Sequence, residues 1–206
     1  MSKGKSLFNI VNSFLISIFK NEGRKFLDQV ILDVNLSDKD EQRKIWRHTT
    51  TTVALVTTEW EGKQNVMACE WVIQTRRSPP QFLIVLGKRK MTAEFILKSR
   101  EFGLTYVSDE QAPLSHLAGS YSGYDLDKIA TNKFPLRSGK IIKAPMVENG
   151  LLAVECKVNQ IIENDERYII IGDVVNAEYR DDKNPIIYHN GKYYKLGENI
   201  PKTLPN

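Results

Sequence analysis

Three basic residues and a threonine stand together at a place where an anion could bind. Lys88, Arg89 and Lys90 follow an apolar run, and Thr92 comes two residues later, before a segment of good helix formers. At such a position an ammonium group, a hydroxyl and the backbone N–H groups of a helix N-terminus can converge on one anion. The alternative is a solvated turn that binds nothing, because short charged runs usually lie on the surface.

The sequence lacks the common motifs of nucleotide, hydrolase and metal chemistry. No GxGxxG follows the first predicted strand, and neither a Walker A sequence nor GxSxG occurs. His48, His116 and His189 are scattered, and Cys69 and Cys156 do not make a disulfide framework. We therefore predict no metal site and no Rossmann nucleotide site.

Composition argues against a nucleic-acid-binding protein. The 206 residues carry a net charge of +4 from 29 basic and 25 acidic residues. That balance differs from the clustered basic stripe typical of nucleic-acid binders. The length and the 41% of hydrophobic residues indicate one globular domain with an appendage.

Most of the elements that would position the basic residues are strands. Alternating or β-branched segments predict them, and Asn190-Gly191 predicts a terminal hairpin. Helices are predicted over Ala93 to Lys98, with Thr92 as the cap, and over Asp109 to Ala118. The predicted strands cover residues 50–58, 64–73, 81–86, 102–107, 151–162, 167–175, 186–188 and 192–194. Many short strands with few helices indicate a closed or nearly closed antiparallel barrel.

Residues 1–45 are predicted to form an N-terminal amphipathic helix and a linker. Ile10, Phe14 and Ile18 recur every four residues, as on one helix face. Polar residues interrupt this stretch and no small-residue cleavage site follows it, so we expect neither a signal peptide nor a membrane span. We therefore expect the protein to be cytoplasmic. We expect the helix to dock on the body or on a partner subunit; membrane-surface contact is the alternative. Ser37 is the expected N-cap of a second, short helix.

Several short blocks occur in a fixed order from about Arg47 to Leu196. In chain order they are TVALVTT, NVMA and SPP from Thr52 onward, KMT from Lys90, SYSGYDLDK from Ser120, APM from Ala144 with ECKV after it, IGDVV from Ile171, and YHNGKY from Tyr188. Each block is weak alone. Together, in this order, they resemble the flavin reductase-like family, including its flavoredoxin branch.

The resemblance implies an FMN-binding split β-barrel for residues 46–206, antiparallel and Greek-key-like, with a few peripheral helices. It also implies FMN held at a homodimer interface and reduced by a nicotinamide nucleotide. The flavin-binding residues that it implies are Asn65, Val66, Met67, Ala68, Cys69, Lys88, Lys90, Met91, Thr92, Ser122, Gly123 and Lys128.

The residue types agree with such a site. An isoalloxazine ring needs backbone amides and carbonyls along its polar edge and apolar packing on its face. The segment from Asn65 to Cys69 can present strand-edge groups, and the small side chain of Ala68 allows close approach. A plain half-buried strand is the alternative.

The ribityl phosphate needs cations and N–H donors, which the Lys90–Thr92 helix start offers, with Lys88 adding charge. Ser122, Gly123 and Lys128 would add hydroxyl, backbone and cationic contacts from a loop. Their alternative role is an ordinary Ser-Gly turn followed by a solvated lysine.

Three positions depart from the family pattern. Ala68 replaces a common threonine, and Glu70 replaces a small residue. A carboxylate beside reduced flavin would disfavour its anionic form, unless the side chain points away. Arg167 stands where many members have a histidine assigned to nicotinamide or flavin contact. Arginine can bind a pyrophosphate or stack on a ring, but it does not titrate near neutrality; we predict Arg167 to bind the nucleotide.

These inferences lead to an NAD(P)H-dependent flavin reductase that passes electrons to free flavin, ferric chelates or a partner protein. The cofactor would supply the redox chemistry, so no side chain is assigned as a general acid or base. A non-catalytic FMN-binding electron carrier, reduced by a protein donor, is the alternative that Arg167 favours. A split-barrel interaction domain that has lost flavin is a third possibility.

Overall fold

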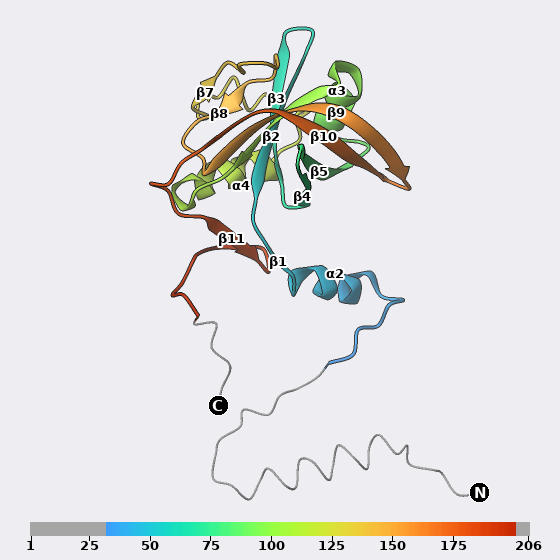
Figure 1. The fold of residues 1–206 in the computed structure, drawn as a ribbon. Coiled ribbons are helices and arrows are strands. Elements are labelled where there is room, and N and C mark those ends of the chain that lie inside the picture. Colours follow the sequence, from blue (N-terminus) through green and yellow to red (C-terminus); the bar gives the residue numbers. More distant parts are fainter. Residues whose placement is uncertain (1–31, 201–206) are drawn as a thin grey trace, which may run out of the picture. The chain divides into compact units, whose positions relative to one another are not determined.

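The computed structural model describes residues 32–200, and the chain divides into two units, Met1–Gln42 and Arg43–Asn206 (Figure 1). The predicted N-terminal amphipathic helix lies outside the described residues. Helix α2 (Lys39–Arg47) begins after Asp38, whose Oδ1 accepts a hydrogen bond of 2.8 Å from the backbone N–H of Asp40. Ser37 is therefore not the N-cap, because the Asp38 carboxylate already binds the first free N–H groups.

A seven-stranded antiparallel sheet forms the body of the second unit. Its order is β3-β2-β6-β9-β10-β5-β4. The strands are β2 (Ala54–Trp60), β3 (Lys63–Cys69), β4 (Val72–Arg77), β5 (Pro80–Gly87), β6 (Glu101–Tyr106), β9 (Leu152–Asn164) and β10 (Arg167–Tyr179). Every pairing in the sheet is antiparallel, so the prediction of a mostly β, antiparallel fold is confirmed.

The two ends of this sheet approach each other at one corner. The Trp71 carbonyl accepts from the N–H of Val85 at 3.0 Å, and the Cys69 thiol lies 3.7 Å from the Val85 carbonyl. Earlier residues of β3 pair with β2 along one edge only. The sheet therefore closes at Cys69 and stays open along the rest of β3, which is the split of the barrel.

Alternation along the strands builds the core. In β5, Phe82, Ile84 and Leu86 are buried in the barrel, whereas the residues between them face outward. Phe102 and Ile170 pack in the same cluster from β6 and β10. The period of two places every second residue on the same face, which is how the sequence encodes this core.

Two predicted strands are each divided in the structure. The segment 50–58 splits into β1 (Thr50–Thr51), which pairs with β11 (Ile186–His189), and β2, which enters the main sheet. The segment 64–73 splits at Glu70 and Trp71, because the chain turns a corner there and β4 pairs with β5. Strand β12 (Lys192–Lys195) completes the predicted terminal hairpin with β11.

The helices flank the open strand. Helix α3 (Met91–Ser99) has Lys90 as its N-cap, so Thr92 lies within the first turn and the prediction of Thr92 as the cap is wrong. The 3-10 turn η1 (Asp109–Gln111) leads into α4 (Ala112–Ser120). A short antiparallel pair, β7 (Leu136–Arg137) with β8 (Met146–Val147), lies between α4 and β9, where no strand was predicted. Within residues 32–200 no helix has the length and apolar character to cross a bilayer.

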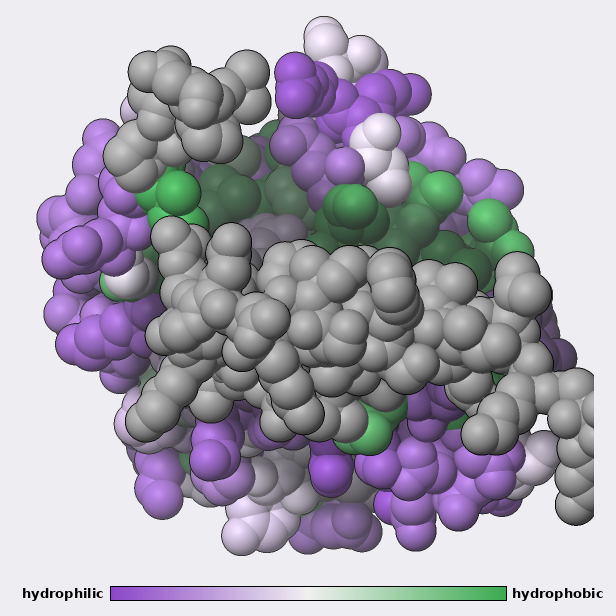
Figure 2. All heavy atoms as spheres, turned by 90° about the horizontal axis from the view of Figure 1, so that it is seen from below, coloured by the Kyte–Doolittle hydropathy of each residue, from purple (hydrophilic) through white to green (hydrophobic). Residues whose placement is uncertain are grey.

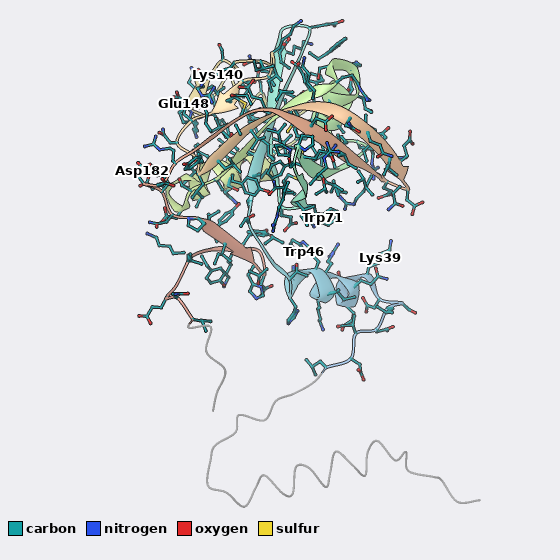
Figure 3. All side chains as sticks on the ribbon, viewed as in Figure 1. Lys39, Trp46, Trp71, Lys140, Glu148 and Asp182 are labelled. Atoms are coloured by element: carbon teal, nitrogen blue, oxygen red, sulfur yellow. The ribbon has the colours of Figure 1, made fainter. Side chains whose placement is uncertain are left out.

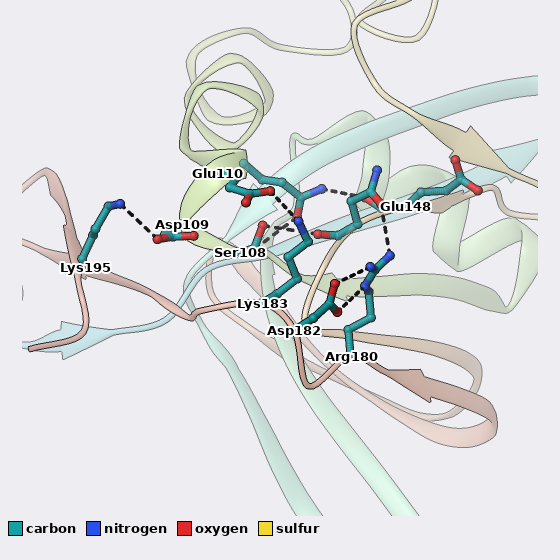
Figure 4. Close-up of polar contacts among 10 residues, drawn as sticks. Ser108, Asp109, Glu110, Glu148, Arg180, Asp182, Lys183 and Lys195 are labelled. Atoms are coloured by element: carbon teal, nitrogen blue, oxygen red, sulfur yellow. Dashed lines mark hydrogen bonds and ion pairs between the residues drawn. The ribbon is translucent and has the colours of Figure 1, made fainter. Parts of the chain in front are cut away.

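Polar contacts tie the segment after β10 to η1 (Figure 4). Lys183 Nζ lies 2.6 Å from Glu110 Oε2, and Arg180 pairs with Asp182 through two nitrogens at 2.8 and 2.6 Å. Lys195 and Asp109 form a further ion pair at 3.4 Å. Each pair has at least one well-exposed partner, so we expect these pairs to orient the segment after β10 and the terminal hairpin more than to add stability.

Glu155 anchors the loop before β8 from inside the protein. Its carboxylate is 1% exposed and accepts from the backbone N–H groups of Lys140, Ile141 and Ile142 and from Asn176 Nδ2, at 2.7–2.9 Å. Burial alone would raise the pKa of Glu155, but these donors outweigh burial and lower it.

Candidate functional site

The open edge of β3 is the feature around which the candidate site is built. The strand is the first of the sheet order, so within the described residues its outer edge has no ladder partner from Lys63 to Ala68. Unpaired N–H and C=O groups on a strand edge can bind the polar edge of a planar ligand. The predicted segment Asn65–Cys69 lies on this edge.

At one end of this edge, Asn65 joins the strand to α3 and to the loop after α4. Its Nδ2 donates to Thr92 Oγ1 at 2.8 Å, and both side chains are buried. A Cβ on Gly123 would lie 2.7 Å from Asn65 Oδ1, so only glycine allows the loop to approach this closely. The structure thus brings Asn65, Thr92 and Gly123 together, although they are distant in sequence.

Two lysines converge beside this cluster. Lys128 is 1% exposed, and its Nζ donates to the Tyr121 carbonyl at 2.9 Å. Burial lowers the pKa of Lys128, and the positive charge of Lys90 lowers it further. The N-cap Lys90 makes no side-chain cap bond, so the first N–H groups of α3 have no side-chain acceptor from their own cap. A buried cation, a second cation and a helix start together favour an anion.

A pocket of about 460 Å³ lies next to the two lysines. It is lined by Gly62, Lys63, Gln64, Asn65, Met91, Gly123, Asp127, Ile129 and Ala130. Tyr124 holds its loop against α3, because the Tyr124 hydroxyl donates to Glu94 Oε2 at 2.5 Å. Ser122 Oγ accepts from the N–H of Tyr124 at 3.2 Å, so its first role is in the turn.

A buried hydroxyl that the sequence analysis missed lies close to Asn65. Thr58 is the cross-strand partner of Asn65, and its Oγ1 is buried with no hydrogen-bond partner in the structure. Buried polar atoms are nearly always satisfied, so such an atom marks a place where a ligand or water is expected.

At the other end of the edge, Ala68 lines a second pocket of about 370 Å³. The other lining residues are Val53, Glu70, His116, Gly119, Ser120, Tyr188, Gly191 and Tyr193. A Cβ on Gly119 would lie 3.5 Å from Ala68 Cβ, so α4 runs close to the strand at this point. No motif in the sequence pointed to His116 or to the two tyrosines, because α4 and the terminal hairpin reach this strand only through the fold.

Glu70, which lines this second pocket, and Arg167 on β10 each contact a tryptophan. Glu70 Oε1 accepts from Trp46 Nε1–H at 2.9 Å, and the Arg167 guanidinium lies 4.1 Å from the centre of the Trp71 ring. Both tryptophans are labelled in Figure 3, Trp71 at the lower edge of the barrel and Trp46 on α2. The stacking expected of Arg167 is thus made with an indole of its own chain.

The remaining strand residues offer the site their backbone rather than their side chains. Val66 is buried beside α4, and Met67 packs against the barrel core. The Cys69 thiol is buried and donates to the Trp71 and Val85 carbonyls, and burial raises its pKa to about 11. This thiol is therefore a neutral core group.

One predicted site residue is engaged elsewhere. Lys88 Nζ lies 2.8 Å from Glu163 Oε2 and 5.3 Å from the centre of the Tyr168 ring. The Lys88 side chain therefore lies against the β9–β10 hairpin, and it does not join the Lys90–Lys128 pair. Among residues 32–200 no group of three or more His, Cys, Asp or Glu side chains is placed to hold a metal.

Comparison with known proteins gives a family. Residues 46–197 match the family model described as flavin reductase like domain. The reductase component of a 4-nitrophenol 4-monooxygenase/4-nitrocatechol 2-monooxygenase from Rhodococcus opacus is 26% identical over 76% of this chain and 80% of its own length. The FMN reductase (NADH) RutF of Pantoea ananatis is 23% identical over 79% of this chain and 84% of its own length.

Solved structures share the fold. The NADH:FAD oxidoreductase SgcE6 of Streptomyces globisporus superposes with a TM-score of 0.76 at 17% identity, covering 82% of this chain and 99% of its own. Flavoredoxin from Methanosarcina acetivorans superposes with a TM-score of 0.69 at 21% identity, covering 85% of this chain and 94% of its own. The open strand, the flanking lysines and the match over residues 46–197 lead to one conclusion: the chain belongs to the flavin reductase-like family.

Proposed function

We propose that this protein is an NAD(P)H-dependent flavin reductase that binds FMN along the open edge of β3. The observation that carries the proposal is the buried Lys128 beside Lys90 and the uncapped start of α3, at one end of an unpaired strand edge. Bound flavin would supply the redox chemistry, accepting hydride from the nucleotide and passing electrons on. The relatives named FMN reductase support FMN as the cofactor.

The two pockets suit the two ends of one FMN. Asn65 and Ala68 are three residues apart on β3, which corresponds to roughly 10 Å along an extended strand. A ribityl chain can cover such a distance. The phosphate would then lie with Lys90, Lys128 and Thr92, and the ring would lie against the strand edge at Ala68.

Each residue at the phosphate end has a specific role in this proposal. Lys128 and Lys90 neutralise the phosphate, and the first-turn N–H groups of α3 donate to its oxygens. Gly123 lets the loop close over Asn65, and Met91 lines the pocket wall. Asn65 fixes the rotamer of Thr92, whose hydroxyl hydrogen remains available to donate.

At the ring end, the backbone of residues 65–69 would bind the polar edge of the flavin. We propose that Arg167, which stacks on Trp71 and is exposed to solvent, binds the pyrophosphate of the nucleotide. Equilibrium dialysis with FMN tests the binding: we expect stoichiometric flavin in the wild-type protein and a much lower affinity in a Lys90→Ala, Lys128→Ala double variant. A protein that binds no flavin would contradict the proposal.

A non-catalytic electron carrier is the second candidate. Arg167 favours it, because an arginine in the place of a titrating histidine cannot exchange a proton near neutral pH. Its signature would be bound FMN that NADH and NADPH reduce slowly and a reduced protein donor reduces fast.

We also propose a homodimer in which the partner covers the open site. The outer face of the sheet carries an apolar row across three strands, Ile73, Leu83 and Ile171, which are cross-strand neighbours. Ile73 is 59% exposed. Figure 2 shows that apolar residues also gather in a hollowed region bordered by hydrophilic residues on the face seen from below. Exposed apolar surface of this kind favours association.

Light scattering on the holoprotein tests the dimer. Ile73→Glu should yield a monomer that holds flavin weakly, whereas Gln74→Glu, which adds the same charge to the neighbouring exposed position, should remain a dimer. A wild-type monomer with stoichiometric FMN would overturn the shared site.

We place the protein in the cytoplasm, where nicotinamide nucleotides are available and where its two free cysteines stay reduced.

A further inference from the structure

Glu70 places a carboxylate in the pocket at the Ala68 end of β3. It lines this pocket together with Ala68 and is half-buried. Trp46 Nε1–H fixes one carboxylate oxygen at 2.9 Å. The side chain therefore points to the pocket region, in a defined orientation.

The charges around Glu70 leave its negative charge largely uncompensated. Arg167, from β10, is the cation whose field reaches it, but the ion pairs of the described residues do not include these two, and Arg167 stacks on Trp71. The other titratable groups at this pocket are His116 on α4, Tyr188 on β11 and Tyr193 on β12. Cys69, next in the chain, is a neutral thiol at physiological pH.

We propose that Glu70 controls the charge of the reduced flavin, holding the ring in its neutral form over a pH range in which it would otherwise be an anion. This inference rests on the proposed function, which places the ring against Ala68. A bound flavin reduced by hydride would carry one negative charge on its ring, and a proton from water at N1 would cancel that charge. The Glu70 carboxylate would favour uptake of this proton.

The contact with Trp46 favours the charged form of Glu70. Burial raises the pKa of Glu70, while the hydrogen bond from Trp46 and the charge of Arg167 oppose that rise. Without the indole donor more of the carboxyl group would be protonated and its field would weaken. Trp46, whose ring also contacts Tyr188 at 6.3 Å, is thus a positioning residue for Glu70.

The size of the effect follows from Coulomb's law. A unit charge about 6 Å from a titrating group, at an effective dielectric constant of about 20, would change the acid dissociation constant of that group about hundredfold. Because Glu70 is only half-buried, water screens part of this field. We expect at least a tenfold change.

The experiment is a pH titration of the reduced holoprotein, without oxygen, followed by the ultraviolet absorbance that separates neutral from anionic reduced flavin. Glu70→Gln and Glu70→Ala should both raise the acid dissociation constant of N1 at least tenfold, and Glu70→Asp should stay near the wild-type value. Glu61→Gln makes the same charge change at the turn between β2 and β3 and should have no effect.

The outcomes separate this inference from the proposed function. Bound, reducible flavin with equal constants in wild type, Glu70→Gln and Glu70→Ala would overturn the role of Glu70 alone. An equal shift in Glu61→Gln would overturn it as well, because the effect would then be one of net charge. A wild-type protein that binds no flavin would overturn the proposed function, and this inference with it.

Discussion

Replacing Lys128 with methionine separates a ligand-binding cation from a structural one. Lys128 is 1% exposed, close to Lys90, and makes one hydrogen bond, to the Tyr121 carbonyl. A lysine kept for stability would have a carboxylate partner at ion-pair distance, since an unpaired buried charge costs several kcal/mol. The charges of Asp127 and Asp125 reach Lys128 and oppose the lowering of its pKa, but Lys128 is not a member of the ion pairs among the described residues. We therefore expect Lys128→Met to weaken FMN binding without destabilising the flavin-free protein.

The magnitudes come from the contacts. Loss of one charge-assisted phosphate contact should cost about 1.5–3 kcal/mol, or ten- to over a hundredfold in FMN affinity. In the flavin-free protein the variant loses the bond to Tyr121, about 1 kcal/mol, but it also removes a buried cation next to Lys90. We expect its free energy of unfolding to be unchanged or higher by about 1 kcal/mol.

The pH dependence has a definite sign. Burial and Lys90 lower the pKa of Lys128 in the folded state, so the unfolded state binds this proton more tightly. The flavin-free wild type should therefore gain stability as the pH rises from the folded pKa towards the ordinary lysine value. Lys128→Met should lack this gain.

Two assays check these expectations: FMN titration by quenching of flavin fluorescence, and urea denaturation without flavin. Lys133→Met, the same substitution at an exposed lysine five residues later, is the control. Lys128→Met with an FMN affinity equal to that of Lys133→Met, or with a large loss of stability in the absence of flavin, would refute the reasoning.

Three further predictions follow from buried contacts. Glu155→Gln replaces one of two oxygens that together accept four hydrogen bonds, and should lower the free energy of unfolding by about 3 kcal/mol at neutral pH in urea denaturation. Because the pKa of Glu155 is lowered in the folded state, this deficit should shrink as the pH falls below about 4, and a pH-independent deficit would contradict it. Gly123→Ala places a methyl group 2.7 Å from Asn65 Oδ1 and should weaken FMN binding at least tenfold in the fluorescence titration while the protein stays folded; unchanged affinity would show that the loop is not part of the site. Burial raises the pKa of Cys69 to about 11 and of Cys156 to about 12, so neither thiol should react with iodoacetamide at pH 8 until the protein unfolds, as mass spectrometry would show.

Patterns of local origin allowed much of the fold to be predicted. The apolar run of residues 81–86 marked a strand, and Asn190-Gly191 marked the terminal hairpin. The alternation in residues 151–162 predicted that Val154 and Cys156 enter the core, but it placed Glu155 on the outward face, whereas the structure buries it. The corners were not predictable. At Glu70 and Trp71 the chain continues with strand-like residues, and only the pairing of β4 with β5 shows that a new strand has begun.

The candidate site was predictable in part for the same reason. Lys90, Thr92 and Gly123 could be selected from their residue types and the family blocks. The structure brings Thr92 and Gly123 to Asn65, and Lys90 to Lys128. Lys88 was misplaced, because its partner Glu163 lies on a hairpin whose position depends on tertiary pairing. The contact of Trp46 with Glu70 spans 24 positions and leaves no periodic trace in the sequence.

The most direct measurement of the central claim is anaerobic stopped-flow mixing of the FMN-loaded, full-length protein with NADH and with NADPH, followed by the visible absorbance of oxidised flavin. We predict that at least one nucleotide bleaches the bound flavin within seconds, in one phase that saturates with nucleotide concentration, and that Arg167→Ala raises the concentration needed for half-saturation. Flavin that stays oxidised with both nucleotides, yet is reduced at once by a reduced electron-transfer protein, would contradict the assignment as a reductase.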